Sequence, residues 1–173
     1  MPAAFRAAGG FALLAATLLF AAPAHAASCR GADDRGGTNA ERTSALRCLA
    51  AQARAKAGRP RLRAVKALRR SASVKAATIE RCRSFSHTPC GRPMAQAMTR
   101  TGYARGCFTV GENLAWVTLG STPRQVLRAW MQSPGHRANL LDTRFRHTGV
   151  ARRVMTLPEG RVEVWVQHFG TRC

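Results

Sequence analysis

Residues 161–169, RVEVWVQHF, decide the fold. Val162, Val164 and Val166 recur at every second position and face one side of an extended strand, while Trp165 and Phe169 face the other. A strand that is apolar on both faces is buried on both faces, so other elements must cover the sheet from both sides. Because helical patterns precede this strand, the sequence predicts a sheet between two helical layers, an α-β-α sandwich.

The elements around this strand follow from turn and capping signals. Residues 148–154 are the expected partner strand, and Pro158–Gly160 is the turn between the two. Residues 108–120, which contain GENLAW, are expected to be irregular or briefly helical. No linker or repeat follows a short polar tail at residues 27–37, so residues 38–173 are expected to form one domain. Capping boxes, apolar spacing and Gly or Pro stops predict helices over residues 38–57, 63–82, 93–101 and 122–132.

The N-terminus has the pattern of a secretory signal peptide over residues 1–26. Arg6 supplies positive charge, Phe11–Ala22 is an apolar run, and Ala24–Ala26 is an A-x-A cleavage site. A membrane-spanning helix needs about 20 apolar residues, so this run is too short for one. Lipidation at Cys29 fits poorly because the aliphatic residue of a lipobox is missing. With no later apolar stretch of that length, we expect a secreted or envelope-associated protein without a transmembrane segment.

All six cysteines lie after the expected cleavage site. An even number in an exported chain predicts three disulfides and argues against a zinc cluster, since no close CxxC pair exists. Six cysteines allow 15 pairings, and the sequence does not select among them. The pairing that we expect is Cys29–Cys48, Cys82–Cys90 and Cys107–Cys173.

The charge of the chain indicates anionic partners. Lys and Arg number 28 against 8 Asp and Glu, which gives a net charge of +20. Such an excess attracts wall polymers, phospholipid head groups, acidic polysaccharide or nucleic acid. The basic residues do not alternate with aromatic residues and form no nucleic-acid motif, which argues against nucleic acid. We therefore expect the protein to bind an anionic envelope polymer or a lipid surface. We also expect it to be a monomer.

Four ordered stretches resemble the bacterial domains of the CAP superfamily, which comprises cysteine-rich secretory proteins, antigen 5 and plant pathogenesis-related proteins. The resemblance implies an SCP-like extracellular domain of the α+β class, a three-layer α-β-α sandwich with a central antiparallel sheet, which agrees with the prediction from the strand. The stretches are GRPRL (58–62), FSHT (85–88), GENLAW (111–116) and WMQSPGHRANLL (130–141), followed by Phe145 and Gly149-Val150.

Many members of that family carry two histidines and two glutamates around a central cavity. Residue by residue, the resemblance places His87, Glu112 and His136 in this cavity. The second glutamate follows a tryptophan by three positions in animal and plant members, and three positions after Trp130 this chain has Ser133. The cavity implied here is therefore His-Glu-His with a serine.

Three roles remain open for these residues. Two imidazoles, His87 and His136, together with one carboxylate are ligands for zinc, although one carboxylate fewer weakens a divalent metal site. Ser133 or Ser86 beside a histidine and Glu112 resembles an acyl-transfer triad, but the chain has no GxSxG motif. In a purely structural role, Glu112 accepts hydrogen bonds from backbone amides and a histidine, because a buried carboxylate requires partners.

The sequence favours a binding module over an enzyme. No cofactor is required, and the one cofactor that remains open is zinc at the His-Glu-His cavity. Members of the family have been linked to lipid or sterol binding and to envelope and host surfaces, and these are the ligand classes that we expect. The alternative is a hydrolase that acts on peptide or wall polymer. Four further residues are expected in the core: Trp116, Trp130, Trp165 and His168.

Overall fold

A central sheet with helices on both faces organises the computed structural model, which describes residues 28–158 and 160–173. The expected signal peptide, residues 1–26, lies outside the described residues. The strands are β1 (Arg63–Ala64), β2 (Phe108–Val117), β3 (His147–Leu157) and β4 (Gly160–Arg172). The helices are α1 (Asn39–Lys56), α2 (Lys66–Cys82), the 3-10 turn η1 (Pro89–Gly91), α3 (Gln96–Arg100), α4 (Pro123–Gln132) and α5 (Pro134–Leu141).

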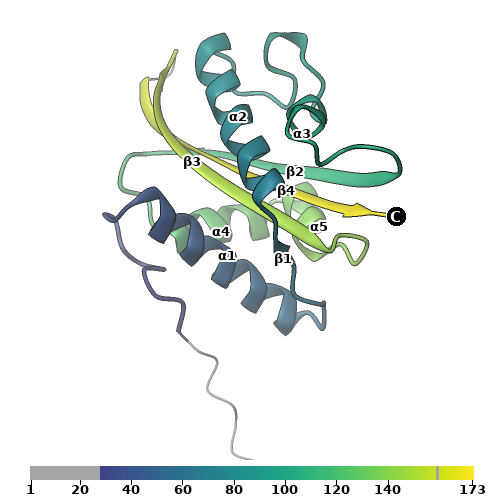
Figure 1. The fold of residues 1–173 in the computed structure, drawn as a ribbon. Helices are drawn as coiled ribbons and strands as arrows, with labels where there is room; N and C mark the ends of the chain where they lie inside the picture. The colour runs from purple at the N-terminus through teal and green to yellow at the C-terminus, as the bar shows by residue number, and fades with distance from the viewer. Residues whose placement is uncertain (1–27, 159) are drawn as a thin grey trace, which may run out of the picture.

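The strand order in the sheet is β1-β3-β4-β2. The short β1 runs parallel to β3, whereas β4 pairs antiparallel with both β3 and β2. Helices α2 and α3 cover one face of this sheet, and α1, α4 and α5 cover the other (Figure 1). The predicted three-layer sandwich is therefore confirmed, with β1 as the single parallel departure from an antiparallel sheet among the described residues.

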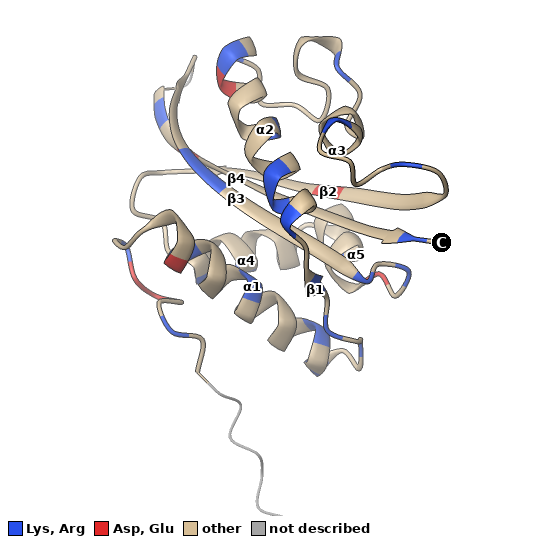
Figure 2. Cartoon of the chain, viewed as in Figure 1, with Lys and Arg blue, Asp and Glu red and all other residues tan. Residues whose placement is uncertain are grey.

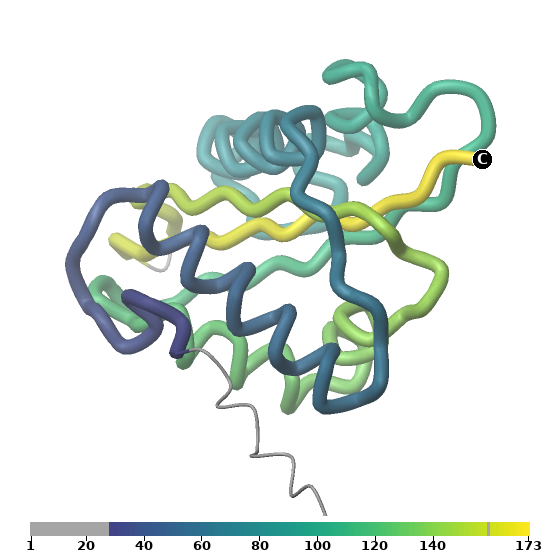
Figure 3. Tube along the Cα trace, turned by 60° about the horizontal axis from the view of Figure 1, so that its bottom comes forward, coloured from purple at the N-terminus to yellow at the C-terminus, as the bar shows by residue number. Residues whose placement is uncertain are grey.

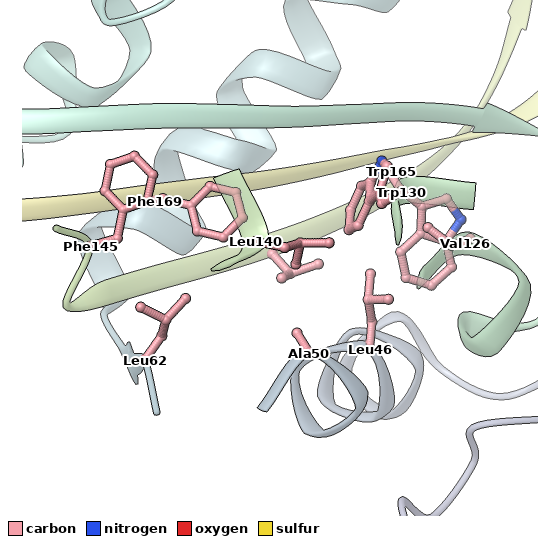
Figure 4. Close-up of a cluster of buried hydrophobic side chains, with 10 residues drawn as sticks. Leu46, Ala50, Leu62, Val126, Trp130, Leu140, Phe145, Trp165 and Phe169 are labelled. Atoms are coloured by element: carbon pink, nitrogen blue, oxygen red, sulfur yellow. The ribbon is translucent and has the colours of Figure 1, made fainter. Parts of the chain in front are cut away.

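Strand β4 is buried on both faces, as its alternation predicts. On one face Val162, Val164 and Val166 pack against α2. On the other face Trp165 and Phe169 join a core shared with α1, α4 and α5 (Figure 4). That second cluster comprises Leu46, Ala50, Leu62, Val126, Trp130, Leu140, Phe145, Val150, Trp165 and Phe169.

Two helices begin at the capping boxes that the sequence indicates. The Thr38 side chain accepts a hydrogen bond from the Glu41 amide, and the Glu41 side chain accepts one from the Thr38 amide. Thr122 and Gln125 form the same reciprocal pair at the start of α4, with Pro123 in its first turn. These contacts satisfy amide groups that have no partner within the helix, so both helix starts are specified locally.

The expectation for residues 108–120 is wrong. Residues Phe108–Val117 form strand β2, which pairs with β4 along its whole length, from Phe108 opposite Arg172 to Val117 opposite Glu163. Glu112 and Asn113 fall in the middle of the strand, and their polar character conceals its alternation. Trp116 is 48% exposed rather than in the core, because it lies near the end of an edge strand.

Two other helix boundaries differ from the expectation. The helix expected from residue 63 begins at Lys66, because Arg63 and Ala64 pair with β3 instead. The helix expected over residues 93–101 is reduced to Gln96–Arg100.

Three disulfides join the cysteines in the expected pairs: Cys29–Cys48, Cys82–Cys90 and Cys107–Cys173. The first ties the polar tail to α1, the second closes the loop after α2, and the third links the start of β2 to the end of β4.

Helix α2 approaches the sheet most closely over Gly149 of β3. A Cβ atom at this position would lie 2.2 Å from the backbone nitrogen of Arg69 and from the carbonyl carbon of Leu68, both in α2. Backbone atoms of a packed helix cannot move aside as a flexible side chain can, so only glycine fits here.

We expect Gly149→Ala to lower the free energy of unfolding by about 3 kcal/mol, because α2 must lift from the sheet to accept the methyl group. Chemical denaturation with the disulfides intact measures this loss. Gly135→Ala is the matched control, since a Cβ there meets no atom within 4 Å and its stability should stay near that of the parent. Equal stability of the two variants would contradict the close approach of α2.

Candidate functional site

Glu112 is the centre of a buried polar cluster between β2, β4 and α2. Glu112 is 3% exposed and lies directly opposite His168 in the β2–β4 register. The Nε2 atom of His168 donates to Oε2 at 2.9 Å, and Nδ1 of His87 donates to Oε1 at 2.6 Å. The Lys75 ammonium of α2 lies 3.4 Å from Oε1. Both carboxylate oxygens therefore have partners.

These partners keep Glu112 ionised. Burial by itself raises the pKa of this carboxyl group, but hydrogen bonds from His168 and His87 and the charge of Lys75 hold it below its ordinary value. Burial also lowers the pKa of Lys75, an effect that the neighbouring Glu112 opposes. A buried carboxylate with three donor side chains is satisfied and fixed in position.

His168 passes the hydrogen-bond chain on to helix α2. The ring is fully buried, and this burial lowers its pKa against the opposing effect of Glu112, so the neutral ring is favoured. Because Nε2 donates to Glu112, Nδ1 of the neutral ring is an acceptor. The Ser71 hydroxyl lies 2.7 Å from Nδ1 and 2.9 Å from the Leu68 carbonyl, so its one proton serves one of these two acceptors at a time. Ser71, His168 and Glu112 have the order of a catalytic triad, but all three residues are buried and their polar atoms already have partners inside the protein.

His87 is the member of the cluster that reaches the surface. It lies in the loop after α2, its side chain is 54% exposed, and Lys75 donates to its backbone carbonyl. Nδ1 of His87 is engaged by Glu112, and Nε2 has no hydrogen-bond partner among the described residues. A carboxylate that orients an exposed imidazole in this way makes it an acceptor or a general base.

His136 lies beside His87 but outside the hydrogen-bonded cluster. Burial lowers the pKa of His136, and the nearby His87 lowers it further. The structure holds the His136 backbone through its carbonyl, which accepts from Asn113 at 3.0 Å. Asn139 of α5 donates to the Glu112 carbonyl and to the Asn113 side chain. Polar contacts thus fix α5 against the middle of β2.

Ser133 and Ser86 do not join these residues. Ser133 ends α4 and precedes α5, and no hydrogen bond within the described residues connects its side chain to Glu112, His87 or His136. The Ser86 hydroxyl accepts from the Thr88 amide. An acyl-transfer triad with an accessible serine is therefore not assembled in the described part of the chain.

Zinc held by Glu112 does not fit this arrangement. Both carboxylate oxygens accept hydrogen bonds from histidines, and a lysine ammonium lies 3.4 Å from one of them, where a second cation would be repelled. Over residues 28–158 and 160–173, no group of three or more His, Cys, Asp or Glu side chains has the geometry to hold a metal ion. A zinc site at His87, Glu112 and His136 is one of the three roles that the sequence leaves open, and the donor geometry does not support it.

The sequence alone did not identify two buried partners of Glu112, the Lys75 ammonium and the His168 imidazole. His168 is buried as expected, but its role as a partner of Glu112 depends on the β2–β4 register. Lys75 had a signal in the sequence, because it falls on the face of α2 that carries Ala72, Ala76 and Ile79. A lysine within an apolar helical stripe requires a buried acceptor.

The family of the chain follows from comparison with known sequences. Residues 3–169 match the model of the cysteine-rich secretory protein (CAP) family. The chain belongs to this family. The uncharacterized protein YkwD of Bacillus subtilis (strain 168) is 42% identical over 64 residues, which are 35% of this chain and 21% of that protein. The match therefore spans about a fifth of that relative's length.

Three solved structures share the fold of this chain. An outer surface protein from Borrelia burgdorferi aligns with a TM-score of 0.66 at 24% identity and covers 79% of this chain and 97% of its own. An extracellular SCP-domain protein from Bacillus anthracis aligns with a TM-score of 0.59 at 20% identity, over 78% of this chain and 44% of its own. A cysteine-rich secretory protein from Staphylococcus aureus aligns with a TM-score of 0.60 at 17% identity, over 76% of this chain and 38% of its own.

We expect Glu112→Gln to destabilise the CAP domain by about 3–5 kcal/mol at pH 7, because it leaves the buried Lys75 charge without its counterion. Denaturant unfolding with intact disulfides measures the loss. Glu80→Gln is the control, since its pair with Arg153 is largely open to solvent and should contribute at most about 1 kcal/mol.

The cost of Glu112→Gln should shrink in acid. The folded-state pKa of Glu112 is held below its ordinary value of 4.5, so its stabilising contribution is complete above that pH and is lost as the pH falls through the folded-state pKa. The same unfolding measurement repeated in steps from pH 7 to pH 3 tests this. A cost independent of pH would mean that Glu112 is not ionised in the folded protein.

Proposed function

We propose that this protein is an extracellular, non-enzymatic binding module that adheres to anionic polymer of the cell envelope. The CAP fold, the three disulfides and the relatives described as extracellular or outer surface proteins support the location. Within the described residues, no helix is long and apolar enough to cross a membrane. The partner class rests on one observation, the distribution of charge.

Five of the seven acidic side chains in the described residues form ion pairs within the protein. Ion pairs join Asp33 to Arg124, Glu80 to Arg153, Glu112 to Lys75, Asp142 to Arg144, and Glu163 to both Arg42 and Arg152. With 28 basic against 8 acidic residues, most basic side chains are left without a carboxylate. Lys and Arg occur on α1, α2, α3, β1 and β3, so positive charge surrounds both helical layers (Figure 2).

A surface of this kind attracts polyanions over distances set by salt. The screening length falls from about 10 Å at 0.1 M salt to about 3 Å at 1 M. Adhesion through many dispersed arginines therefore weakens steeply as salt is added. Catalysis at His87 or His136 would not depend on this long-range attraction.

The mature protein should be retained on immobilised polygalacturonate at about 0.1 M NaCl and be released well before 1 M, because screening removes the attraction. A neutral dextran resin is the control and should retain nothing. The His136→Ala variant should elute with the parent, since adhesion does not use the histidine pair. Retention that persists at 1 M salt, or is lost in His136→Ala, would argue against this function.

A lipid surface is the second candidate, and one observation favours it. Trp116 and Leu119 are 48% and 45% exposed at the end of β2 and in the loop after it. An exposed tryptophan and leucine on a strongly basic protein are typical of side chains that enter the interface of an anionic bilayer.

If lipid is the target, phosphatidylglycerol vesicles should shift the tryptophan emission of the protein to the blue, and phosphatidylcholine vesicles should not. Trp130 and Trp165 are already buried, so the shift must come from Trp116 and should vanish in Trp116→Ala. Binding to the anionic vesicles without any emission shift would mean that the protein adheres by electrostatic attraction only and that Trp116 does not enter the bilayer.

A further inference from the structure

A groove between α1 and the edge strand β1 has features of a ligand site, and it lies apart from the Glu112 cluster. The chain leaves α1, turns and returns beside it to reach β1 and α2 (Figure 3). Between these two segments lies a cavity of about 470 Å³. A second cavity of about 450 Å³ shares Arg47, Ala64 and Thr148 with the first. Small-molecule sites occupy about 300–1,000 Å³, so each part is large enough for a ligand.

Arg54 contributes a buried cation to the lining of this groove. It is 0% exposed, and its guanidinium donates to the carbonyls of Pro60, Leu140 and Asp142. No ion pair within the described residues includes Arg54, because the nearby Asp142 carboxylate is held by Arg144. Its Nη2 atom is buried and has no hydrogen-bond partner in the described part of the protein. A buried charge in this condition favours an anion.

Gln167 of β4 adds an unsatisfied acceptor to the same lining. It is also 0% exposed, and its Nε2 donates to the Thr148 hydroxyl at 3.1 Å. Its Oε1 atom is buried and accepts no hydrogen bond from any described residue. A ligand that satisfies both Arg54 and Gln167 therefore carries an acceptor, for which an anionic oxygen suits the guanidinium best, and a donor such as a hydroxyl group.

The rim of the groove is basic. Arg47, Arg61 and Arg63 line the first cavity, and Lys66 and Arg69 line the second. No Asp or Glu belongs to either lining. Arg47 and Arg61 make no side-chain hydrogen bond or ion pair with any described residue, so their guanidinium groups are free to meet an acid group of a ligand.

We propose that this groove binds an anionic carbohydrate or polyol unit, with its acid group against Arg47, Arg54 and Arg61 and a hydroxyl donating to Gln167. The assignment rests on the proposed adhesion to envelope polymer and gives that adhesion a specific subsite. The acid group is a carboxylate or a phosphate, as in a uronic acid or a polyol phosphate, and both have the same chemistry toward a guanidinium.

The test compares two double variants that remove the same charge. Arg47→Ser with Arg61→Ser empties the groove rim, whereas Arg105→Ser with Arg161→Ser removes two exposed arginines outside both cavities. Titration calorimetry at 0.1 M salt uses tetragalacturonate as the probe, maltotetraose as the neutral control, and a glycerol-phosphate tetramer to separate carboxylate from phosphate. We expect the groove variant to lose at least about tenfold in affinity and the control variant to stay near the parent.

Amide chemical shifts of the parent protein provide a second readout that does not depend on any variant. An anionic tetramer, unlike maltotetraose, should shift residues 44–54, 61–64, 148 and 167. Equal losses in the two double variants, or shifts spread evenly over the basic surface, would overturn the groove while leaving the proposed adhesion intact. If neither anionic tetramer binds and polygalacturonate does not retain the protein, the groove and the proposed function both fail.

Discussion

The requirement to surround the Glu112 carboxylate with donors constrains more of this structure than any other single contact. A buried charge that loses its partners costs several kcal/mol, so each partner must be held in place. Lys75 comes from α2, His87 from the loop after it and His168 from β4. On the opposite face of the sheet, Asn139 of α5 donates to the Glu112 backbone carbonyl. One residue of β2 is therefore tied to both helical layers.

A second buried carboxylate serves the other face of the sheet. Glu163 of β4 is 1% exposed and receives hydrogen bonds from Arg42 of α1, Arg152 of β3 and the Gly120 amide. Burial raises the pKa of Glu163, but Arg152 and the other donors bring it below its ordinary value. The planar guanidinium meets several acceptors in fixed directions, which a lysine ammonium cannot do. Arginine thus has a structural role here besides its contribution to surface charge.

The parts of the fold that were predictable are those that depend on local pattern. Val162, Val164, Val166, Trp165 and Phe169 specify a doubly buried strand by themselves, since alternation in a strand has a period of two. The capping boxes at the starts of α1 and α4 are equally local. Strand β2 was not predicted because its central residues, Glu112 and Asn113, are polar. Their hydrogen-bond partners lie in other elements, which the local sequence does not reveal.

The candidate site was predictable only in part, for the same reason. The resemblance pointed to His87, Glu112 and His136, and the structure joins the first two by a hydrogen bond and brings the third beside them. His168 enters only through the register between two strands. Arg54 is harder still, because an arginine among the alanines of α1 has the pattern of a solvated side chain. Its burial depends on carbonyls at the end of α5, far along the chain.

The use of guanidinium groups in the groove also sets the conditions in which the protein can work. An arginine side chain stays protonated at every pH that a protein survives, so the positive charge of this surface does not titrate. The fold does respond to acid. Burial lowers the pKa of His168, so its neutral ring stabilises the protein fully only above the ordinary value of 6.5, and Glu112 adds a second loss below 4.5. The acid limit of this protein is therefore set by its folding and not by its charge.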